Sequence, residues 1–344
     1  MWDAQIEVFS TCPQWSGSKR EHFLKSVADT ARWSEQYGCK GILVYSDNSQ
    51  IDPWLVSQFI LQNTHDLCPL IAVQPIYMHP YSVAKTITSI ACLSRRRIYL
   101  NMVAGGFKND LTALSDTTPH DKRYSRLLEY TLIIKQLLGG GAPVSYQGEF
   151  YRIANLNLTP PLPQELFPGI FVSGSSEAGV AAAQELDATT IEYPKPPGEY
   201  DTRCSGRGQK GIRIGLIARQ TEDEAWQVAH EQFPRDRKGE LAHQLAMRTS
   251  DSIWHKDLSE LEKQTEDAKN PYWLRPFETY KSFCPYLVGN YERVAGEISK
   301  YLAIGYSTFI LDIPASEEDL HHVSIAFNHA VRQRGVKLSS CAEV

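Results

Sequence analysis

The chain has 344 residues, of which 42% are hydrophobic and 22% are charged, which is typical of a globular protein with a large core. The formal net charge of −5 gives no basic surface for a polyanion, so nucleic acid is not an expected partner. No apolar run approaches the ~20 residues of a membrane helix, and no basic and apolar leader opens the chain, so neither a membrane span nor secretion is expected.

Cysteine usage indicates a reducing compartment. The seven cysteines are an odd number and include no Cys-x-x-Cys pair. Neither a zinc site nor a disulfide framework is therefore expected, and no other metal-ligand motif is present. We expect a cytoplasmic protein whose thiols are mostly buried and unreactive.

Short apolar runs alternate with longer segments whose apolar residues recur at helical spacing. The runs predict eight strands: Ile6–Phe9, Gly41–Tyr45, Leu70–Gln74, Ile98–Val103, Gly169–Val172, Thr189–Glu192, Arg213–Ala218 and Ser307–Leu311. The longer segments predict seven helices: Glu21–Tyr37, Pro53–Asn63, Tyr81–Leu93, Arg123–Leu138, Glu177–Leu186, Asp223–Gln232 and Glu317–Arg332.

Three segments depart from this alternation. Val144–Tyr146 and Phe150–Ile153 predict a β-hairpin, and the Pro- and Gly-rich segment 194–211 predicts a loop. Residues 236–285, between the seventh and eighth strands, are polar and partly helical and carry Trp254, His255, Tyr272 and Trp273. Aromatic residues among charges favour a lid over a pocket, and the alternative is a solvated helical excursion with a local core.

Every predicted strand is a continuous apolar run, as in parallel sheets that are buried on both faces. Eight such strands alternating with helices favour a (β/α)₈ TIM barrel, with an open α/β sheet as the alternative. We expect one barrel domain over residues 1–335, with 236–285 as the lid insertion and 336–344 as a C-terminal tail. The site is then expected at the C-terminal ends of the strands.

The segment from Val172 to Gly179 predicts a phosphate cradle at the end of the fifth strand. Gly174, Ser175 and Ser176 are small, and a helix follows them at once. Small residues let the backbone approach an anion, and the helix N-terminus supplies free N–H groups and positive potential. The alternative is an ordinary serine N-cap beside a turn glycine.

Three further segments place polar side chains at strand ends. Asn101 puts an amide inside the fourth apolar run, with Ala104 and paired glycines beyond it that leave room for a flat ring. His120 and Tyr124 flank Asp121, which is placed as a helix N-cap. His79 follows the third strand and is a candidate general base, although a lone histidine before a proline is more often structural.

The sequence lacks the motifs of most other reaction classes. It has no Walker lysine motif, no dinucleotide-binding Gly-x-Gly-x-x-Gly after the first strand, no His-Glu-x-x-His and no nucleophile elbow. The chemistry is therefore expected to come from a bound cofactor.

These segments resemble the bacterial luciferase-like flavin monooxygenases, and among them the alkanesulfonate monooxygenases. The resemblance covers Ile6 to about Val331 and is strongest in four stretches: Asn101–Gly106, His120–Tyr124, the Tyr146–Tyr151 hairpin and Ser173–Gly179. Asp223–Trp226 and Leu287–Gly289 also match.

The resemblance implies a (β/α)₈ barrel and a reduced FMN delivered by a separate NAD(P)H-dependent flavin reductase, with dioxygen as co-substrate. The resemblance implies a set of flavin-binding residues, some of which match the family's positions and some of which lie next to them. They are Asn101, Ala104, His120, Tyr124, Gly174, Ser175, Ser176 and Tyr193. Arg213, on the seventh strand, matches an active-site arginine of the alkanesulfonate enzymes. We also expect a homodimer or homotetramer.

Four positions depart from the alkanesulfonate pattern. Gly215 stands where that pattern has a histidine, Ile313 where it has a tyrosine and Gln50 where it has a cysteine. No histidine follows the first strand, where this chain has Thr11-Cys12-Pro13. The flavin half of the pattern is present and the sulfonate half is not.

The sequence therefore predicts a two-component flavin monooxygenase that oxidises a small organic metabolite other than a simple alkanesulfonate. The alternatives are a deazaflavin-dependent oxidoreductase and a non-catalytic flavin-binding barrel. We expect the substrate pocket to be lined by residues at or just beyond strand ends: Cys12, Tyr45, Gln74, His79, Tyr193 and Arg213. Among these, Cys12, His79 and Arg213 are the candidate catalytic residues, and Arg213 could instead form a structural ion pair with Glu192.

Overall fold

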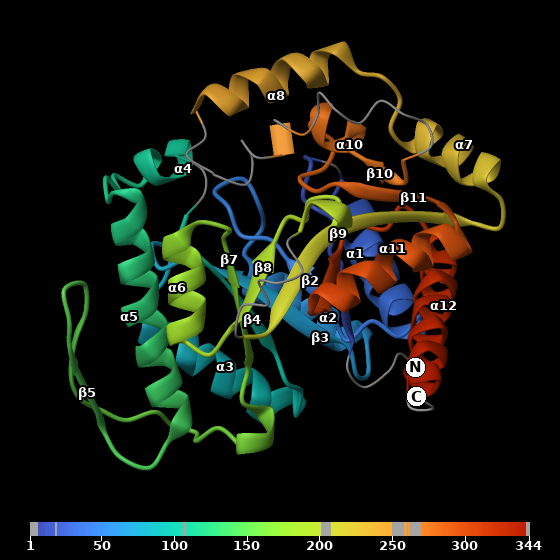
Figure 1. The fold of residues 1–344 in the computed structure, drawn as a ribbon. Helices are drawn as coiled ribbons and strands as arrows, with labels where there is room; N and C mark the ends of the chain where they lie inside the picture. The colour runs from blue at the N-terminus through green and yellow to red at the C-terminus, as the bar shows by residue number, and fades with distance from the viewer. Residues whose placement is uncertain are drawn as a thin grey trace. The chain divides into compact units, whose positions relative to one another are not determined.

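The computed structural model describes residues 6–17, 19–105, 108–200, 208–249, 258–259, 261 and 270–341. Gly106, Cys204, Trp254 and His255, which the sequence singled out, lie outside these residues. The chain forms two compact units (Figure 1). Unit 1 comprises Met1–Thr11, Arg32–Lys40 and Glu192–Val344, and unit 2 comprises Cys12–Ala31 and Gly41–Ile191.

Unit 2 contains a parallel sheet in which each strand is followed by a helix. Its strands are β2 (Gly41–Val44), β3 (Cys68–Val73), β4 (Tyr99–Val103), β7 (Gly169–Ser173) and β8 (Thr189–Glu192), in that order across the sheet. The helices are α2 (Pro53–Asn63), α3 (Pro80–Ser94), α4 (Lys108–Ala113), α5 (His120–Gly139) and α6 (Glu177–Glu185). The predicted hairpin is present as β5 (Val144–Gln147) and β6 (Arg152–Leu156), and η1 (Gln164–Leu166) precedes β7.

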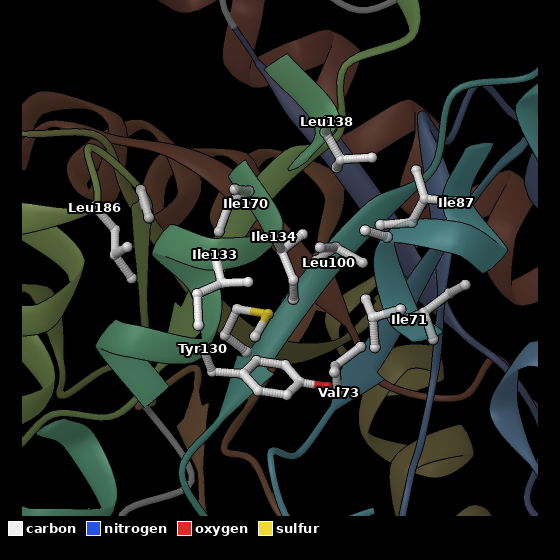
Figure 2. Packing of buried hydrophobic residues seen from close by; sticks show 14 of the residues in the cluster. Ile71, Val73, Ile87, Leu100, Tyr130, Ile133, Ile134, Leu138, Ile170 and Leu186 are labelled. Carbon is white, nitrogen blue, oxygen red and sulfur yellow. The ribbon is translucent and has the colours of Figure 1, made fainter. Parts of the chain in front are cut away.

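The core of unit 2 lies between its sheet and helices α3 and α5. Figure 2 shows Tyr130 and Ile134 of α5 together with Leu100 of β4 and Val73 of β3 in one apolar cluster. The Tyr130 hydroxyl donates a hydrogen bond of 2.9 Å to the carbonyl of Met78, so this fully buried side chain also satisfies its polar atom. This packing fixes the loop after β3 against α5.

Unit 1 contains the strands at both ends of the sequence. Its sheet has the order β10 (Tyr272–Trp273), β11 (Tyr286–Asn290), β9 (Lys210–Arg219), β12 (Tyr306–Leu311) and β1 (Glu7–Thr11). All its neighbouring strands are parallel except the β10–β11 pair. The helices of this unit are α7 (Glu222–Gln232), α8 (Arg237–Thr249), α10 (Arg275–Glu278), α11 (Tyr291–Ile304) and α12 (Glu317–Cys341), with η2 (Pro197–Glu199) after β8. Helix α1 (Arg20–Gln36) is divided, since its residues up to Ala31 belong to unit 2 and those from Arg32 to unit 1.

All eight predicted strands are present, and three predictions about local structure were wrong. The sequence analysis omitted β11 and α11, because β11 is short and contains Gly289. Asp121 is not the N-cap of α5, since the helix begins at His120 after Pro119, whose fixed φ suits a helix start. Helix α12 continues to Cys341, so residues 336–341 are helical rather than a tail.

The segment proposed as a lid divides into two parts in the described residues. Helix α8 carries Leu241 and Leu245, which are 60% and 62% exposed. In contrast, Tyr272 and Phe277 are 2% and 0% exposed, and the Tyr272 hydroxyl donates a hydrogen bond to the Pro194 carbonyl. Residues 270–285 therefore belong to the core of unit 1, and the lid remains a prediction for the residues before them.

No helix of the described residues is long and apolar enough to cross a membrane.

A buried ion pair stabilises the start of α5. Arg126 Nη2 lies 2.6 Å from Asp116 Oδ2, and these side chains are 12% and 4% exposed. Asp116 Oδ1 also accepts hydrogen bonds from the backbone N–H and the hydroxyl of Thr118. Burial alone would raise the pKa of Asp116, but the hydrogen bonds from Arg126 and Thr118 outweigh it and lower the pKa to about 2.

We predict that Asp116→Asn lowers the free energy of unfolding by about 2 kcal/mol at pH 7. A carboxyl whose pKa is lowered by folding stabilises the protein above its unfolded pKa near 4, and this contribution is lost as pH falls toward 2. The difference from wild type in urea denaturation should therefore shrink between pH 4 and pH 2. Glu165→Gln, at an exposed carboxylate, is the control, and a pH-independent difference would contradict the assignment.

Candidate functional site

The turn between β7 and α6 forms a cradle of small polar residues. Ser176 is the N-cap of α6, and its Oγ accepts a hydrogen bond of 3.1 Å from the Gly179 N–H. Helix α5 lies beside α6 (Figure 1). The serine N-cap, which was the alternative to a phosphate cradle, is therefore present, and it leaves the remaining first-turn N–H groups of α6 available to an anion.

Gly174 is the residue on which the cradle's shape depends. Its φ is +155°, and a Cβ at this position would lie 2.2 Å from the Tyr124 hydroxyl oxygen. Tyr124 is 9% exposed, and burial raises the pKa of its phenol while a hydrogen bond with Ser176 lowers it. A neutral phenol therefore reaches the backbone of the turn, which no side chain at position 174 would allow.

Ser175 provides an unsatisfied polar atom in this turn. Its Oγ is buried and has no hydrogen-bond partner among the residues that the structure describes. A buried hydroxyl without a partner is unfavourable, and such atoms are rare unless a ligand or water completes them. The hydroxyl, the adjacent helix N-terminus and the space over Gly174 together fit a phosphate group.

Asn101 and Ser173 are joined across neighbouring strands. Asn101 of β4 is 6% exposed, and its Oδ1 accepts a hydrogen bond of 2.7 Å from the Ser173 hydroxyl. This bond orients the amide so that its nitrogen is the group left to face a ligand. Ala104 is buried just beyond the strand, and Gly105 has a φ of +107°.

The predicted His120 and Tyr124 pair is also brought together. The two ring centroids lie 5.3 Å apart at the start of α5, and His120 Nδ1 lies 2.8 Å from Asp121 Oδ1. Asp121 thus orients the His120 ring instead of capping the helix.

His79 and Cys12 have more limited chemistry than the sequence indicated. His79 is the N-cap of α3, where its Nδ1 accepts a hydrogen bond of 3.2 Å from the Tyr81 N–H, so only Nε2 is left for another role. Burial raises the pKa of the Cys12 thiol well above its usual range, which keeps it protonated. Cys12 lines a small cavity with Tyr45 and Gln50.

A larger cavity of about 300 Å³ lies at the ends of β2 and β3, within unit 2. Gln74, predicted to line the substrate pocket, is one of its walls, together with Asp47, Trp54 and Tyr77. Among the residues that the structure describes, no lysine or arginine lines it.

Unit 1 has its own group of polar side chains, although Arg213 lies within β9 and not at a strand end as expected. Arg213 of β9 is 5% exposed, and its Nη2 lies 3.8 Å from Oδ1 of Asp312, the residue after β12. Its Nη1 lies 3.5 Å from the Tyr193 hydroxyl oxygen. Glu192, the partner in the alternative structural ion pair, instead accepts a hydrogen bond from Tyr306, and the carboxylate beside Arg213 is Asp312.

Asp312 also accepts two hydrogen bonds on its other carboxylate oxygen. The Tyr286 hydroxyl donates to Oδ2 over 2.7 Å, and the Ser282 hydroxyl donates to the same atom over 2.5 Å. Both lone pairs of this oxygen are thus used by hydroxyl donors. We call Arg213, Tyr286, Ser282 and Asp312 the Asp312 cluster.

Gly215 makes room for this cluster. It is the register partner of Tyr286 on the adjacent strand, and a Cβ at position 215 would lie 2.3–2.4 Å from three atoms of the Tyr286 ring. The space beside Gly215, where the alkanesulfonate pattern has a histidine, is therefore filled by a tyrosine from β11.

Sequence reasoning missed Ser173, Tyr286 and Asp312. Ser173 is adjacent to the cradle and could have been included on that ground. Asp312 follows the eighth strand directly, so the rule that sites lie at strand ends also selects it. Tyr286 could not be found while β11 was unassigned.

Comparison with known proteins extends these observations. A family model described as luciferase-like monooxygenase matches residues 5–308. The chain is 35% identical over 312 residues to 4-(gamma-L-glutamylamino)butanoyl-[BtrI acyl-carrier protein] monooxygenase BtrO of Niallia circulans, covering 89% of this chain and 91% of that protein.

Solved structures show the same fold at low sequence identity. DmoA from Hyphomicrobium sulfonivorans matches with a TM-score of 0.74 and 14% identity, covering 96% of this chain and 88% of that one. Riboflavin lyase RcaE, solved with modified FMN and riboflavin, matches with a TM-score of 0.71 and 17% identity over 96% and 91% of the two chains. The family and fold matches confirm the predicted (β/α)₈ barrel.

We predict opposite effects of alanine at the two adjacent serines of the cradle. Ser176→Ala removes an N-cap and should lower the free energy of unfolding by about 1 kcal/mol. Ser175→Ala removes a buried hydroxyl that makes no hydrogen bond in the described structure, so stability should stay the same or rise slightly. Urea denaturation of the two variants checks this, and an equal loss in both would show that Ser175 is structurally bonded.

Gly215→Ala should destabilise the protein by about 1–3 kcal/mol, because the added methyl group displaces the Tyr286 ring. Gly296→Ala is the matched control, since a Cβ there meets nothing within 4 Å and alanine favours the α11 helix. Thermal unfolding should separate the two variants in opposite directions. Equal melting temperatures would mean that Tyr286 moves away freely.

Proposed function

Because the chain belongs to the luciferase-like monooxygenase family, we propose that it uses reduced FMN and dioxygen to oxidise a small organic substrate. The main support for FMN as the cofactor is the cradle at the end of β7. Its unpartnered Ser175 hydroxyl, the α6 N-terminus and the Tyr124 phenol over Gly174 match what an FMN phosphate requires. The solved structure of RcaE with modified FMN supports the same cofactor class.

The residues of unit 2 would hold the flavin as follows. Ser175, Ser176 and the backbone of α6 would bind the phosphate, and the Asn101 amide nitrogen would donate to the edge of the ring. His120 and Ala104 would border the flavin. Bound reduced FMN supplies the electrons with which dioxygen is activated and one oxygen atom is inserted into the substrate.

Other residues of the proposed site would act on the substrate and on protons. His79 keeps Nε2 available for proton transfer, whereas Cys12, as a buried neutral thiol, would shape the pocket without ionising. Arg213 is kept as a proposed catalytic residue and Tyr193 as a proposed cofactor contact, as the resemblance implies.

The proposed partner is a separate NAD(P)H-dependent flavin reductase. Both proteins are proposed to be cytoplasmic, and this chain is proposed to form a homodimer or homotetramer. The name of the relative BtrO identifies an acyl group attached to an acyl-carrier protein as that enzyme's substrate. Carrier-linked acyl groups and free small metabolites are therefore the first substrates to test.

A deazaflavin-dependent oxidoreductase is the second candidate. A deazaflavin cofactor also carries a phosphate, so the cradle alone does not separate the two. Oxygen consumption separates them, because hydride transfer from a deazaflavin needs no oxygen.

Anaerobic titration with reduced FMN tests the proposal. The Ser175→Ala/Ser176→Ala variant should bind it at least 10-fold more weakly, since each lost hydrogen bond to a phosphate is worth about 1.5–3 kcal/mol. Thr221→Ala is the control, because it removes the equivalent N-cap from α7, outside the cradle. Unchanged affinity in the double variant would remove the phosphate site from this turn.

The oxygen-dependent step is checked separately with the wild-type protein, a flavin reductase and a substrate panel. The expected product is heavier than the substrate by one oxygen atom and carries label from ¹⁸O₂. Tight binding of a deazaflavin with product formed in the absence of oxygen would instead establish the second candidate.

A further inference from the structure

The cavity of about 300 Å³ in unit 2 has the size of a small ligand pocket. It opens where Ser46 and Gln74 follow β2 and β3 and is closed by the first turn of α2. It therefore lies at the strand ends, where a barrel enzyme binds its substrate.

Two carboxylates face this cavity with one oxygen each still available. Asp47 Oδ1 accepts hydrogen bonds from the backbone and hydroxyl of Ser49, and Asp52 Oδ1 accepts from the first N–H groups of α2. In the described structure neither Oδ2 accepts a hydrogen bond, and no lysine or arginine lines the cavity to offset the charges.

Gln74 gives independent evidence for a hydrogen-bond donor in the ligand. It is 8% exposed, and its Nε2 donates a hydrogen bond of 2.9 Å to the Ser46 carbonyl. That bond turns Oε1 the other way, and within the described residues Oε1 has no donor. Gln74 Oε1 is therefore an acceptor at the wall of the cavity that a ligand N–H group can use.

The aromatic walls are also suited to a cation. Trp54 and Tyr77 line the cavity. The Tyr77 hydroxyl already donates its proton to Asn48 Oδ1 over 2.8 Å, so it does not donate to the ligand. Burial, followed by the negative charges of Asp110 and Asp47, raises the pKa of Tyr77 to about 12. The cavity thus combines hydrogen-bond acceptors, aromatic faces and negative potential.

We propose that this cavity binds a protonated primary amine of the substrate, with its N–H groups donating to Gln74 Oε1 and to the carboxylate of Asp47, and with Asp52 at the rim. This inference rests on the proposed function, because it names the substrate class of that monooxygenase. The substrate would be a small organic compound with an ammonium group. An anionic group is disfavoured there by both carboxylates.

Calorimetric titration of the cofactor-free protein with butylamine at pH 7 tests the proposal, and butanol serves as the uncharged probe of similar shape. Butylamine should bind at least 10-fold more tightly than butanol. Asp47→Asn/Asp52→Asn should remove that preference, and Gln74→Met should reduce it. Asn can keep both local turns, so the double variant is expected to fold.

Asp223→Asn, which removes an exposed carboxylate of α7, is the control and should leave the preference unchanged. Equal binding of butylamine and butanol to the wild type would overturn the proposal. Loss of reduced-FMN binding in the double variant would also overturn it, because the cavity would then belong to the flavin. Since the titration needs no cofactor, it can succeed even if the protein proves not to be a monooxygenase.

Discussion

The close approach of the Tyr124 hydroxyl to the backbone of Gly174 is the constraint on which the cradle depends. It ties the end of β7 to helix α5, and the same phenol bonds to Ser176 at the start of α6. Three elements are thereby held at one point, while the neighbouring Ser175 hydroxyl is left buried without a partner in the described structure. A turn fixed in this way is ready to bind an anion and loses little conformational freedom when it does.

Gly215 in unit 1 likewise leaves room for a tyrosine ring. In both places a glycine, Gly174 just after β7 and Gly215 within β9, lacks the Cβ that would exclude a phenol from another element. Tyr124 reaches Gly174 from a helix, and Tyr286 covers Gly215 from the adjacent strand. Each phenol then bonds to a polar residue of the proposed site, Ser176 in one case and Asp312 in the other. The glycines matter for the space that they leave, and the tyrosines supply the chemistry that a local side chain would otherwise give.

This arrangement explains what the sequence could and could not predict. The eight strands were found because each is buried on both faces and so is a continuous apolar run, and the cradle because its serines and glycine are adjacent in sequence. The partners of those residues come from elsewhere in the chain: Ser173 lies 72 positions from Asn101, and Asp312 lies 26 from Tyr286. Such pairs depend on strand register, and the unassigned β11 hid one of them. The apparent cap at Asp121 failed because Pro119 already starts the helix.

The charges around Arg213 bear on which substrates the enzyme would accept. Asp312 Oδ1 lies 3.8 Å from the guanidinium, and its Oδ2 accepts hydrogen bonds from the hydroxyls of Tyr286 and Ser282. A sulfonate or carboxylate placed at Arg213 would gain from the cation but would also lie within several ångströms of this carboxylate. Two like charges ~4 Å apart repel by about 4 kcal/mol at a protein surface, which is comparable to the attraction that Arg213 could offer. The departure from the alkanesulfonate pattern is therefore more than the loss of a histidine and a tyrosine, because Asp312 itself disfavours an anionic group at this arginine.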